Sequence, residues 1–460
     1  MSESNRSDAT RSTGFDPLSG YLPSRRDFLG TAAGSLAAAA IAGVGAGAAR
    51  ASAGVRLDEP VGKAAKRAAL KEGQTIRMAV VGTGGMGTGH CGAFAKLNKE
   101  RGANVEVVAL ADPWPANMNR AHQKLTEEWQ TGVEVTRHAD YRELLKREDV
   151  HGVLIATPEH WHGQVARDAI LAGKDVYCEK PMTLHLEDAV HLHRMVKANP
   201  EMILQVGTQK MALPSYREAT KWVAEGLIGT PTVSQTSYCR NTPKGEWNYY
   251  HVDPNWKPGK DVDWDMWCGP LGKQAWDPYL LNRWRRYKLT STGIIGDLLV
   301  HVLTPLMMAV NQGWPVKVTA SGAHLIDKKM ENHDTVNIIA EFETGHQMIV
   351  IGATNNDTGL VPMIRGPKGN IEVNDGSIRF SPQKPYAEEA ESRKPQLANI
   401  GDDQDQHRMN WLQCIRTRQQ PEANSESGLQ VMVIVDLATR CLWEGGSWKF
   451  DPSTMKATRV

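Results

Sequence analysis

The 460-residue sequence predicts an α/β protein, with a doubly wound parallel sheet in the first domain and an α+β second domain with a mostly antiparallel open sheet. Short apolar runs alternate with helical stretches between residues 76 and 209, and a glycine-rich turn follows the first run. From residue 316 onward, β-like runs are separated by turn residues. Strands that alternate with helices imply a parallel sheet covered on both faces, which supports the first half of this prediction.

The strands of the first domain are expected where short apolar runs end in glycine, proline or a polar residue. These runs lie at residues 76–81, 105–111, 150–156, 176–178 and 202–206. Helical stretches between and after them lie at residues 143–147, 163–172 and 186–197. We therefore expect the first domain to extend over residues 76–209.

The second domain is expected to begin near residue 210 with a helix at residues 216–225 and a long, irregular aromatic segment at residues 240–290. Strands are predicted at residues 316–320, 335–342, 347–353, 370–373 and 377–380, before a polar loop at residues 383–406. A helix at residues 428–443 and a short strand near Trp448 end the chain. We expect residues 210–460 to carry the substrate-binding groups and the contacts between subunits.

The first residues predict an export signal instead of a part of the fold. A twin-arginine pair, Arg25 and Arg26, precedes an uncharged Ala/Gly-rich stretch at residues 30–49 and a small-residue cleavage pattern. This arrangement is typical of a signal peptide for the twin-arginine (Tat) pathway, here residues 1–53, and predicts a periplasmic or otherwise exported protein. The alternatives are an Ala-rich solvent helix and an uncleaved signal that acts as an anchor. Residues 54–75 are polar and predict a linker or an N-terminal arm.

Composition excludes several classes of protein. The chain has 53 basic and 52 acidic residues, and this balance argues against a nucleic-acid surface. No run after the signal approaches the ~20 apolar residues of a spanning helix, so no membrane span is expected in the mature protein. The six cysteines are scattered without a C-x-x-C pair. They predict neither a metal site nor a dense disulfide framework.

The glycine-rich turn at residues 82–87 directly follows an apolar strand and opens a candidate helix. This is the context that a dinucleotide-binding fingerprint requires, although a plain βα turn is the alternative. Its glycines allow a tight turn and a close approach of the backbone to a pyrophosphate, as in Rossmann domains. The residues expected to contact the dinucleotide here are Gly82, Gly84, Gly85, Met86 and Gly87.

Asp112 ends the second strand, where an acidic residue can accept hydrogen bonds from the adenosine ribose. It lies 30 residues after Gly82, and a polar insertion at residues 98–104 accounts for the unusual spacing. No arginine directly follows Asp112, and its carboxylate would repel a 2′-phosphate. The sequence therefore favours NAD over NADP, unless a distant basic residue intervenes.

Lys180 stands between Glu179 and Pro181 at the end of a predicted strand, where doubly wound sheets bind ligands. A lysine there can stabilise an alkoxide and relay a proton, whereas the alternative is a surface ion pair. Asp297 and His301 are four residues apart and would share one face of a helix. His301 could accept a hydroxyl proton, and activity would then fall as the pH drops through an ordinary imidazole pKa of ~6.5. A packed histidine and a helix charge are the alternative.

The order and content of these segments resemble the Gfo/Idh/MocA family of sugar and polyol oxidoreductases from residue 76 to about residue 450. The resemblance implies a catalytic or substrate-orienting role for Lys180, and catalytic and substrate-binding roles for Asp297 and His301. The family often has another Asp shortly after this His, where this chain has Thr304 and Pro305.

The same resemblance extends to other segments. Residues 157–162 resemble a family segment that borders the nicotinamide, and residues 407–415 resemble the closing helix of the family. The resemblance implies cofactor contacts for Thr157, Pro158, His162, Glu179 and Lys180, and a substrate contact for Gln209 near the domain junction. A structural role for His162 is the alternative.

Aromatic residues concentrate in one segment, because six of the 14 tryptophans lie within residues 247–284. Such rings can stack on sugars, or they can pin a loop or bury a subunit contact. The basic run at residues 283–288 could bind an acidic sugar or form a solvated or interface surface.

These features predict an exported NAD-dependent oxidoreductase for a secondary alcohol of a sugar, glycoside or polyol, working as a homo-oligomer (dimer or tetramer). Because no soluble nicotinamide pool is expected outside the cytoplasm, the cofactor should stay bound. One alternative is a glycoside-cleaving enzyme that oxidises its substrate transiently and eliminates the aglycone. The other is a non-catalytic sugar-binding protein.

Overall fold

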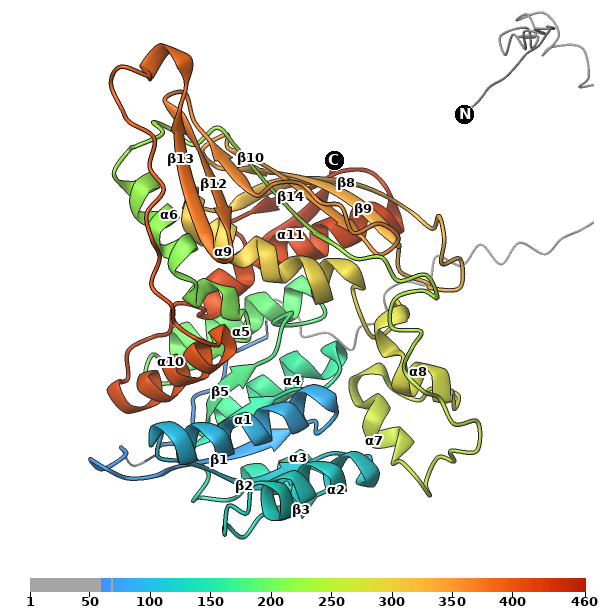
Figure 1. Ribbon diagram of the computed structural model, residues 1–460. Coiled ribbons are helices and arrows are strands. Elements are labelled where there is room, and N and C mark those ends of the chain that lie inside the picture. Colours follow the sequence, from blue (N-terminus) through green and yellow to red (C-terminus); the bar gives the residue numbers. More distant parts are fainter. Residues whose placement is uncertain (1–58, 68) are drawn as a thin grey trace, which may run out of the picture. The chain divides into compact units, whose positions relative to one another are not determined.

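A computed structural model describes residues 59–67 and 69–460 (Figure 1). The predicted signal peptide lies outside the described residues. The described chain forms a domain around a six-stranded parallel sheet, followed by a domain around a nine-stranded sheet. Both halves of the predicted fold class are therefore confirmed. Within the described ranges, no helix has the length and apolar character needed to cross a membrane.

The first sheet has the strand order β3-β2-β1-β4-β5-β6, and every neighbouring pair is parallel. Its strands are β1 (Ile76–Val81), β2 (Val105–Ala111), β3 (Thr136–His138), β4 (Gly152–Ile155), β5 (Asp175–Cys178) and β6 (Leu204–Val206). The apolar runs are nearly continuous because helices cover both faces of the sheet. Strand β3 was not predicted, because its three residues are polar and give no apolar signal.

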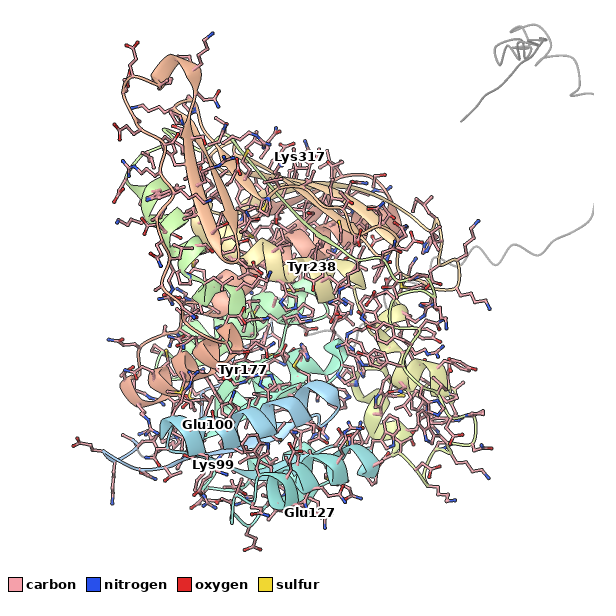
Figure 2. The ribbon with its side chains drawn as sticks, viewed as in Figure 1. Lys99, Glu100, Glu127, Tyr177, Tyr238 and Lys317 are labelled. Atoms are coloured by element: carbon pink, nitrogen blue, oxygen red, sulfur yellow. The ribbon has the colours of Figure 1, made fainter. Side chains whose placement is uncertain are left out.

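Helices α1 (Gly85–Arg101) and α10 (Asp403–Thr417) cover one face of this sheet, and α4 (Glu159–Leu171) and α5 (Leu186–Ala198) cover the other. The short helices α2 (Pro115–Gln123) and α3 (Tyr141–Leu145) follow β2 and β3. Tyr177 of β5 lies inside the domain, with its ring edge-on to Trp411 of α10 at 5.6 Å (Figure 2). A helix from the end of the chain thus completes the core of the first domain.

The second sheet has the order β13-β12-β11-β7-β10-β9-β8-β14-β15. Its strands are β7 (Val233–Cys239), β8 (Pro315–Ala323), β9 (Thr335–Phe342), β10 (Gln347–Ala353), β11 (Met363–Arg365), β12 (Gly369–Asn374), β13 (Ser377–Pro382), β14 (Trp448–Asp451) and β15 (Lys456–Arg459). All neighbouring pairs are antiparallel except β7 and β10, which are parallel. Buried and exposed residues alternate along β9, so only one face of the sheet is covered.

Three helices cover that face: α6 (Pro214–Ala224), α9 (Val300–Val310) and α11 (Ser425–Glu444) (Figure 1). The central strand β7 was not predicted from the sequence. Its fully buried positions are Ser234 and Thr236, and the Ser234 hydroxyl lies 2.8 Å from Nε2 of His346. Because these inward positions are polar, β7 lacks the apolar alternation that identifies a strand.

The aromatic segment, residues 240–290, contains the short helices α7 (Trp264–Cys268) and α8 (Pro278–Asn282). It packs beside the first domain rather than on the open face of the second sheet (Figure 1). Trp264 stacks on Trp267 with ring centroids 4.8 Å apart, and Trp114 of the first domain belongs to the same apolar cluster. This segment of the second domain therefore covers one side of the first domain.

Candidate active site

The glycine-rich turn closes against the end of β4. A Cβ atom on Gly82, whose φ is +82°, would lie 2.6 Å from the backbone N of Thr157. A Cβ atom on Gly87 would lie 2.0 Å from the carbonyl oxygen of Gly82. Gly84 and Gly85 instead have open space at this position and line a cavity of about 650 Å³. The first N–H groups of a helix lack intrahelical partners and attract anions, so this cradle fits the pyrophosphate of NAD.

Asp112 has a structural task in addition to its predicted contact with the ribose. Its Oδ2 accepts hydrogen bonds from the backbone N (2.7 Å) and Oγ1 (3.0 Å) of Thr83, and its Oδ1 accepts one from the backbone N of Trp114 (2.8 Å). Burial raises the pKa of this carboxyl group. A carboxylate has about four acceptor positions, so one remains for a ribose hydroxyl. Arg120, which was not predicted as a site residue, also lines the cavity.

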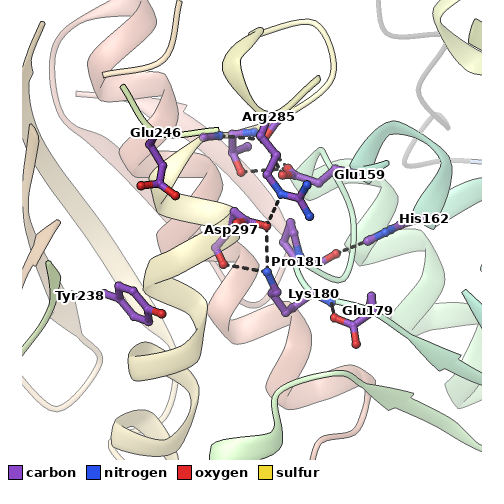
Figure 3. Close-up of polar contacts among 12 residues, drawn as sticks. Glu159, His162, Glu179, Lys180, Pro181, Tyr238, Glu246, Arg285 and Asp297 are labelled. Carbon is purple, nitrogen blue, oxygen red and sulfur yellow. Dashed lines mark hydrogen bonds and ion pairs between the residues drawn. The ribbon is translucent and has the colours of Figure 1, made fainter. Parts of the chain in front are cut away.

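Lys180 lines the same cavity and contacts Asp297, which is not itself a lining residue (Figure 3). The Nζ of Lys180 donates to the backbone O and to Oδ1 of Asp297, both at 2.8 Å. The Nε of Arg285 donates to the same Oδ1 at 2.8 Å. Burial alone would raise the pKa of Asp297, but Arg285 and Lys180 hold it well below its usual range. Asp297 is therefore an anion, and its Oδ2 has no hydrogen bond to any described residue.

Asp297 does not lie on a regular α-helix, which corrects the geometry expected for the D-x-x-x-H pattern. It belongs to a π-helical turn, Ile295–Leu299, that continues into α9. A Cβ atom on Gly296 would lie 1.9 Å from Oγ1 of Thr292 and 3.2 Å from Cγ of Pro181. The bare Gly296 lets this turn approach the segment of Lys180 closely enough for the contact with the backbone of Asp297.

His301 is the second residue of α9 and is half-buried. Its ring centroid lies 6.1 Å from that of Tyr238, and its buried Nδ1 has no hydrogen-bond partner in the described chain. It is not among the residues that line the cavity. Burial, together with the nearby charge of Lys180, lowers the pKa of His301 to about 3, so the imidazole is neutral at neutral pH. The structure brings Lys180 and Asp297 into contact and leaves His301 without a hydrogen bond to either.

Glu179, beside Lys180, is the first member of a buried series of polar contacts that the sequence did not predict. His90 of α1 lies with Nε2 2.9 Å from Oε1 of Glu179, and its Nδ1 accepts a hydrogen bond from Nε of Arg408 at 3.0 Å. The Nη1 of Arg408 in turn donates to Oδ1 of Asp405 at 2.7 Å. Because Nδ1 is an acceptor, the proton of a neutral His90 lies on Nε2 and is donated to Glu179.

The pKa values of this pair agree with that assignment. Burial would raise the pKa of Glu179, but the hydrogen bond from His90 and the nearby charges lower it to about 2. Burial lowers the pKa of His90. A Cβ atom on Gly207 would lie 3.0 Å from the Glu179 carboxylate, so the glycine there makes room for it. The pair is a neutral imidazole that donates to an anionic carboxylate next to Lys180.

His162 lines the cavity, but both of its ring nitrogens face backbone carbonyls. Nδ1 lies 2.7 Å from the O of Pro181 (Figure 3). Nε2 lies 2.9 Å from the O of Thr157. The ring therefore joins two backbone segments beside the cavity, which favours the structural role for His162. Glu159, one turn earlier, accepts hydrogen bonds from Ser291 and Thr292, and burial raises its pKa to about 7.

The structure gathers most of the predicted site residues around one cavity. Those that line it are Gly82, Gly84, Gly85, Met86, Asp112, Thr157, Pro158, His162, Glu179 and Lys180. Gly87 is not a lining residue, but it packs against the carbonyl oxygen of Gly82 within the turn. Gln209 begins a 3₁₀ turn after β6 and is not a lining residue. Its predicted substrate contact stays a prediction.

The basic run at residues 283–288 supplies a site residue. The guanidinium of Arg285 lies 4.0 Å from the ring centroid of Trp284, and both residues line the cavity. Arg286 is buried and pairs with Asp327. The interpretation of this run as a solvated surface is therefore wrong at Arg285 and Arg286. The sequence signal that could have identified Arg285 as a site residue was weak: an arginine next to a tryptophan within the aromatic segment.

Comparison with known proteins gives the family. Residues 76–208 match the family model of Gfo/Idh/MocA oxidoreductases described as an NAD-binding Rossmann fold, and residues 214–459 match its C-terminal α/β domain. The chain therefore belongs to the Gfo/Idh/MocA oxidoreductase family. The first domain is an NAD-binding Rossmann domain, which confirms the prediction of NAD as the cofactor.

Curated relatives are distant. Inositol 2-dehydrogenase 1 of Saccharopolyspora erythraea is 32% identical over 159 residues, which cover 35% of this chain and 44% of the relative. Levoglucosan dehydrogenase of Pseudarthrobacter phenanthrenivorans is 25% identical over 239 residues, which cover 50% of each chain. The matched part of the chain spans about half the length of these relatives.

Solved structures share the fold. Levoglucosan dehydrogenase in complex with NADH has a TM-score of 0.62 at 20% identity and covers 81% of this chain and 98% of its own. An aldose-aldose oxidoreductase from Caulobacter crescentus, complexed with glycerol, has a TM-score of 0.58 at 18% identity and covers 82% of this chain and 100% of its own. At these identities, the likeness establishes the fold alone.

Proposed function

We propose that this protein is an exported NAD-dependent oxidoreductase that acts on a secondary alcohol of a sugar, glycoside or polyol. The observation that carries the proposal is the buried Lys180–Asp297 ion pair, whose lysine lines the cavity that the dinucleotide turn also lines. Relatives named as dehydrogenases of inositol and of levoglucosan support this substrate class. Both named substrates carry ring hydroxyl groups.

The side chains divide the work of alcohol oxidation. NAD, when bound, accepts the hydride. A lysine ammonium has three donors, and Lys180 uses two of them on Asp297, so the third can stabilise the oxygen that becomes an alkoxide. The free Oδ2 of Asp297 can accept a hydrogen bond from a neighbouring substrate hydroxyl. His301, which is neutral at neutral pH, is the candidate for accepting the hydroxyl proton.

We further propose that NAD stays bound through many turnovers, because an exported enzyme meets no soluble nicotinamide pool. A second substrate must then reset the cofactor, or the overall reaction must be redox-neutral. Transient oxidation followed by elimination of an aglycone is the redox-neutral alternative. The retained Lys180–Asp297 pair argues against a non-catalytic sugar-binding protein.

A homo-oligomer, a dimer or tetramer, belongs to the same proposal. The open face of the second sheet supports it, because this face carries the large apolar side chain of Ile339, which is 44% exposed. Light scattering of the purified protein tests the proposal, and a monomer at micromolar concentration would overturn it.

The first test of function uses the protein as purified. Its nucleotide is released by denaturation and identified, and the native protein is then given a panel of free sugars, polyols and glycosides. Reduced nicotinamide absorbance reports oxidation, and free aglycone reports elimination. The absence of both signals on every compound contradicts the proposed function.

Lys180→Ala is the matched variant in this assay. A positioned acid–base group contributes ~10²–10⁴-fold to the rate, so we expect a loss of that order on the active compound. Asp297 keeps Arg285 as a partner, so the variant should retain bound NAD and melt near the parent temperature. Near-parent turnover by Lys180→Ala would show that the lysine has no catalytic role.

A further inference from the structure

The aromatic segment, residues 240–290, forms one wall of the cavity that the dinucleotide turn opens into. The segment contributes Tyr250, Trp256, Trp267, Leu281, Asn282 and Trp284 to the lining. The opposite lining comes from the glycine turn and from the residues that follow β2. One cavity thus joins the cofactor-binding strand ends to a segment of the second domain.

The wall is attached to the first domain next to Asp112, at the end where Rossmann domains hold the adenosine. The backbone N of Asp263 donates to the carbonyl O of Pro113 at 2.9 Å. The ring of Trp256 meets that of Trp114 edge-on, with centroids 4.8 Å apart. Trp114 is itself 9% exposed and lines the cavity.

A second attachment holds the wall on α4. The carbonyl O of Trp267 lies 3.0 Å from Nε2 of His160 and accepts a hydrogen bond from Nε1 of Trp161 at 2.8 Å. A Cβ atom on Gly269, whose φ is +41°, would lie 1.9 Å from the ring of Trp161. The backbone of the segment therefore packs directly on this ring. Two separate attachments, one at Pro113 and Trp114 and one on α4, therefore hold the segment against the first domain.

We propose that this wall closes the adenosine half of the NAD site and retains the cofactor, with Trp256 as the residue that contributes most. The inference rests on the proposed function in one respect, the cofactor that stays bound through turnover. It assigns that retention to the second domain. Aromatic side chains beside a base stabilise its binding, and their removal weakens it on the order of tenfold to a hundredfold.

The test measures exchange of bound NAD for isotopically labelled NAD in the purified holoprotein, followed by mass spectrometry of the nucleotide. Trp256→Ala should exchange on the order of tenfold to a hundredfold faster than the parent. Tyr279→Ala is the matched control, because Tyr279 lies on the same segment, is 49% exposed and is not a lining residue. Its exchange rate should equal that of the parent.

Trp256→Phe separates ring contact from folding, because it keeps an aromatic face and should exchange near the parent rate. If Trp256→Ala is unstable, Trp256→Leu replaces it, and circular dichroism confirms its fold. Equal exchange by parent and by the folded non-aromatic variant overturns the inference.

This readout counts nucleotide and not turnover, so its failure is distinguishable from failure of the proposed function. A protein that oxidises sugars but exchanges NAD independently of Trp256 overturns the inference and leaves the function standing. A protein that retains NAD through Trp256 but acts on no compound overturns the function and leaves the wall as the retaining element.

Discussion

At Asp297, one carboxylate oxygen accepts hydrogen bonds from both Lys180 and Arg285. A buried charge is costly unless it is paired, so the second cation has a consequence for the site. Arg285 gives the carboxylate a second cationic partner, so Asp297 is paired on Oδ1 by two side chains and not by Lys180 alone.

The buried imidazole of His301 predicts a pH profile that differs from that of an ordinary histidine. Its competent form as a base is neutral, and burial lowers its pKa to about 3. Activity that depends on His301 should therefore persist as the pH falls from 8 to about 5 and should be lost only near the lowered pKa. The acid limb expected near ~6.5 from the sequence is corrected downward, because that value belongs to a solvated imidazole.

Measurement of kcat/KM between pH 5 and 8 checks this prediction, with His301→Gln as the variant. His301→Gln should lose activity by ~10²–10⁴-fold without removing any limb in this range. A limb near pH 7 that disappears in Glu159→Gln would instead belong to Glu159, whose pKa is about 7. A limb near 6.5 that disappears only in His301→Gln would contradict the assignment.

His90 is expected to act as a positioning residue for Glu179. The folded pKa of Glu179, about 2, lies below the ordinary 4.5, so its stabilisation is present above pH 4.5 and is lost as the pH falls toward 2. This shift corresponds to roughly 3 kcal/mol. His90→Leu removes the donor and leaves the desolvated carboxylate, so the pKa of Glu179 should rise. An acid limb in kcat/KM should then appear at higher pH than in the parent.

His90→Gln is the control, because its amide can still donate to Glu179. It should keep the parent pH profile, whereas His90→Leu should not. A residue that only filled space would change the melting temperature in both variants and leave the pH profile unchanged in both. That pattern would contradict the positioning role.

At the scale of elements, the β1–turn–α1 unit predicts opposite effects for two glycines of the same helix. Gly87→Ala places a Cβ atom 2.0 Å from the carbonyl oxygen of Gly82, so the turn must open. We expect loss of bound NAD and a destabilisation of about 1–3 kcal/mol. Thermal unfolding and the nucleotide content of the purified variant measure both effects.

Gly89→Ala is the matched control within α1, because a Cβ atom added at Gly89 would have no neighbour within 4 Å. An exposed alanine is more favourable than glycine in a helix by about 0.8–1.0 kcal/mol, so this variant should be slightly stabilised and keep NAD. Equal NAD content in both variants would show that the turn tolerates a side chain at Gly87.

At the scale of the whole molecule, the site requires both domains and the end of the chain. Glu179 directly follows β5, His90 lies on α1, and Arg408 lies on α10, more than 200 residues later than Glu179. The fully buried Trp411 of α10 also completes the core of the first domain. A first domain expressed without α10 would expose this apolar face.

At this scale we predict that the protein is exported after it has folded around NAD. Arg25→Lys with Arg26→Lys should retain the full chain in the cytoplasm of a Tat-competent bacterial host, because the pathway recognises the arginine pair. Fractionation and immunoblotting measure the distribution. Arg11→Lys, which changes an arginine outside the pair, should leave export unchanged. Export of the double variant through an intact envelope would contradict the Tat assignment.

The sequence alone was sufficient for features whose signal is local. The apolar runs of the first sheet, the glycine turn and the placement of Lys180 at a strand end all depend on neighbouring residues. Backbone preferences and hydrophobic periodicity act over a few positions, so they can be recognised without the fold. Where the local pattern was polar, as in β3 and β7, the strands were missed.

The tertiary structure decided the features that depend on distant residues. The contact of Lys180 with Asp297 depends on a π-helical turn that lets the chain pack on Pro181. His90 and Arg408 meet across 318 positions, and the wall from the aromatic segment reaches Trp114 in another domain. Burial, which moves the pKa values of His301 and Glu159, also exists only in the folded chain. The sequence therefore determined which chemical groups are present, and long-range packing determined their partners and charge states.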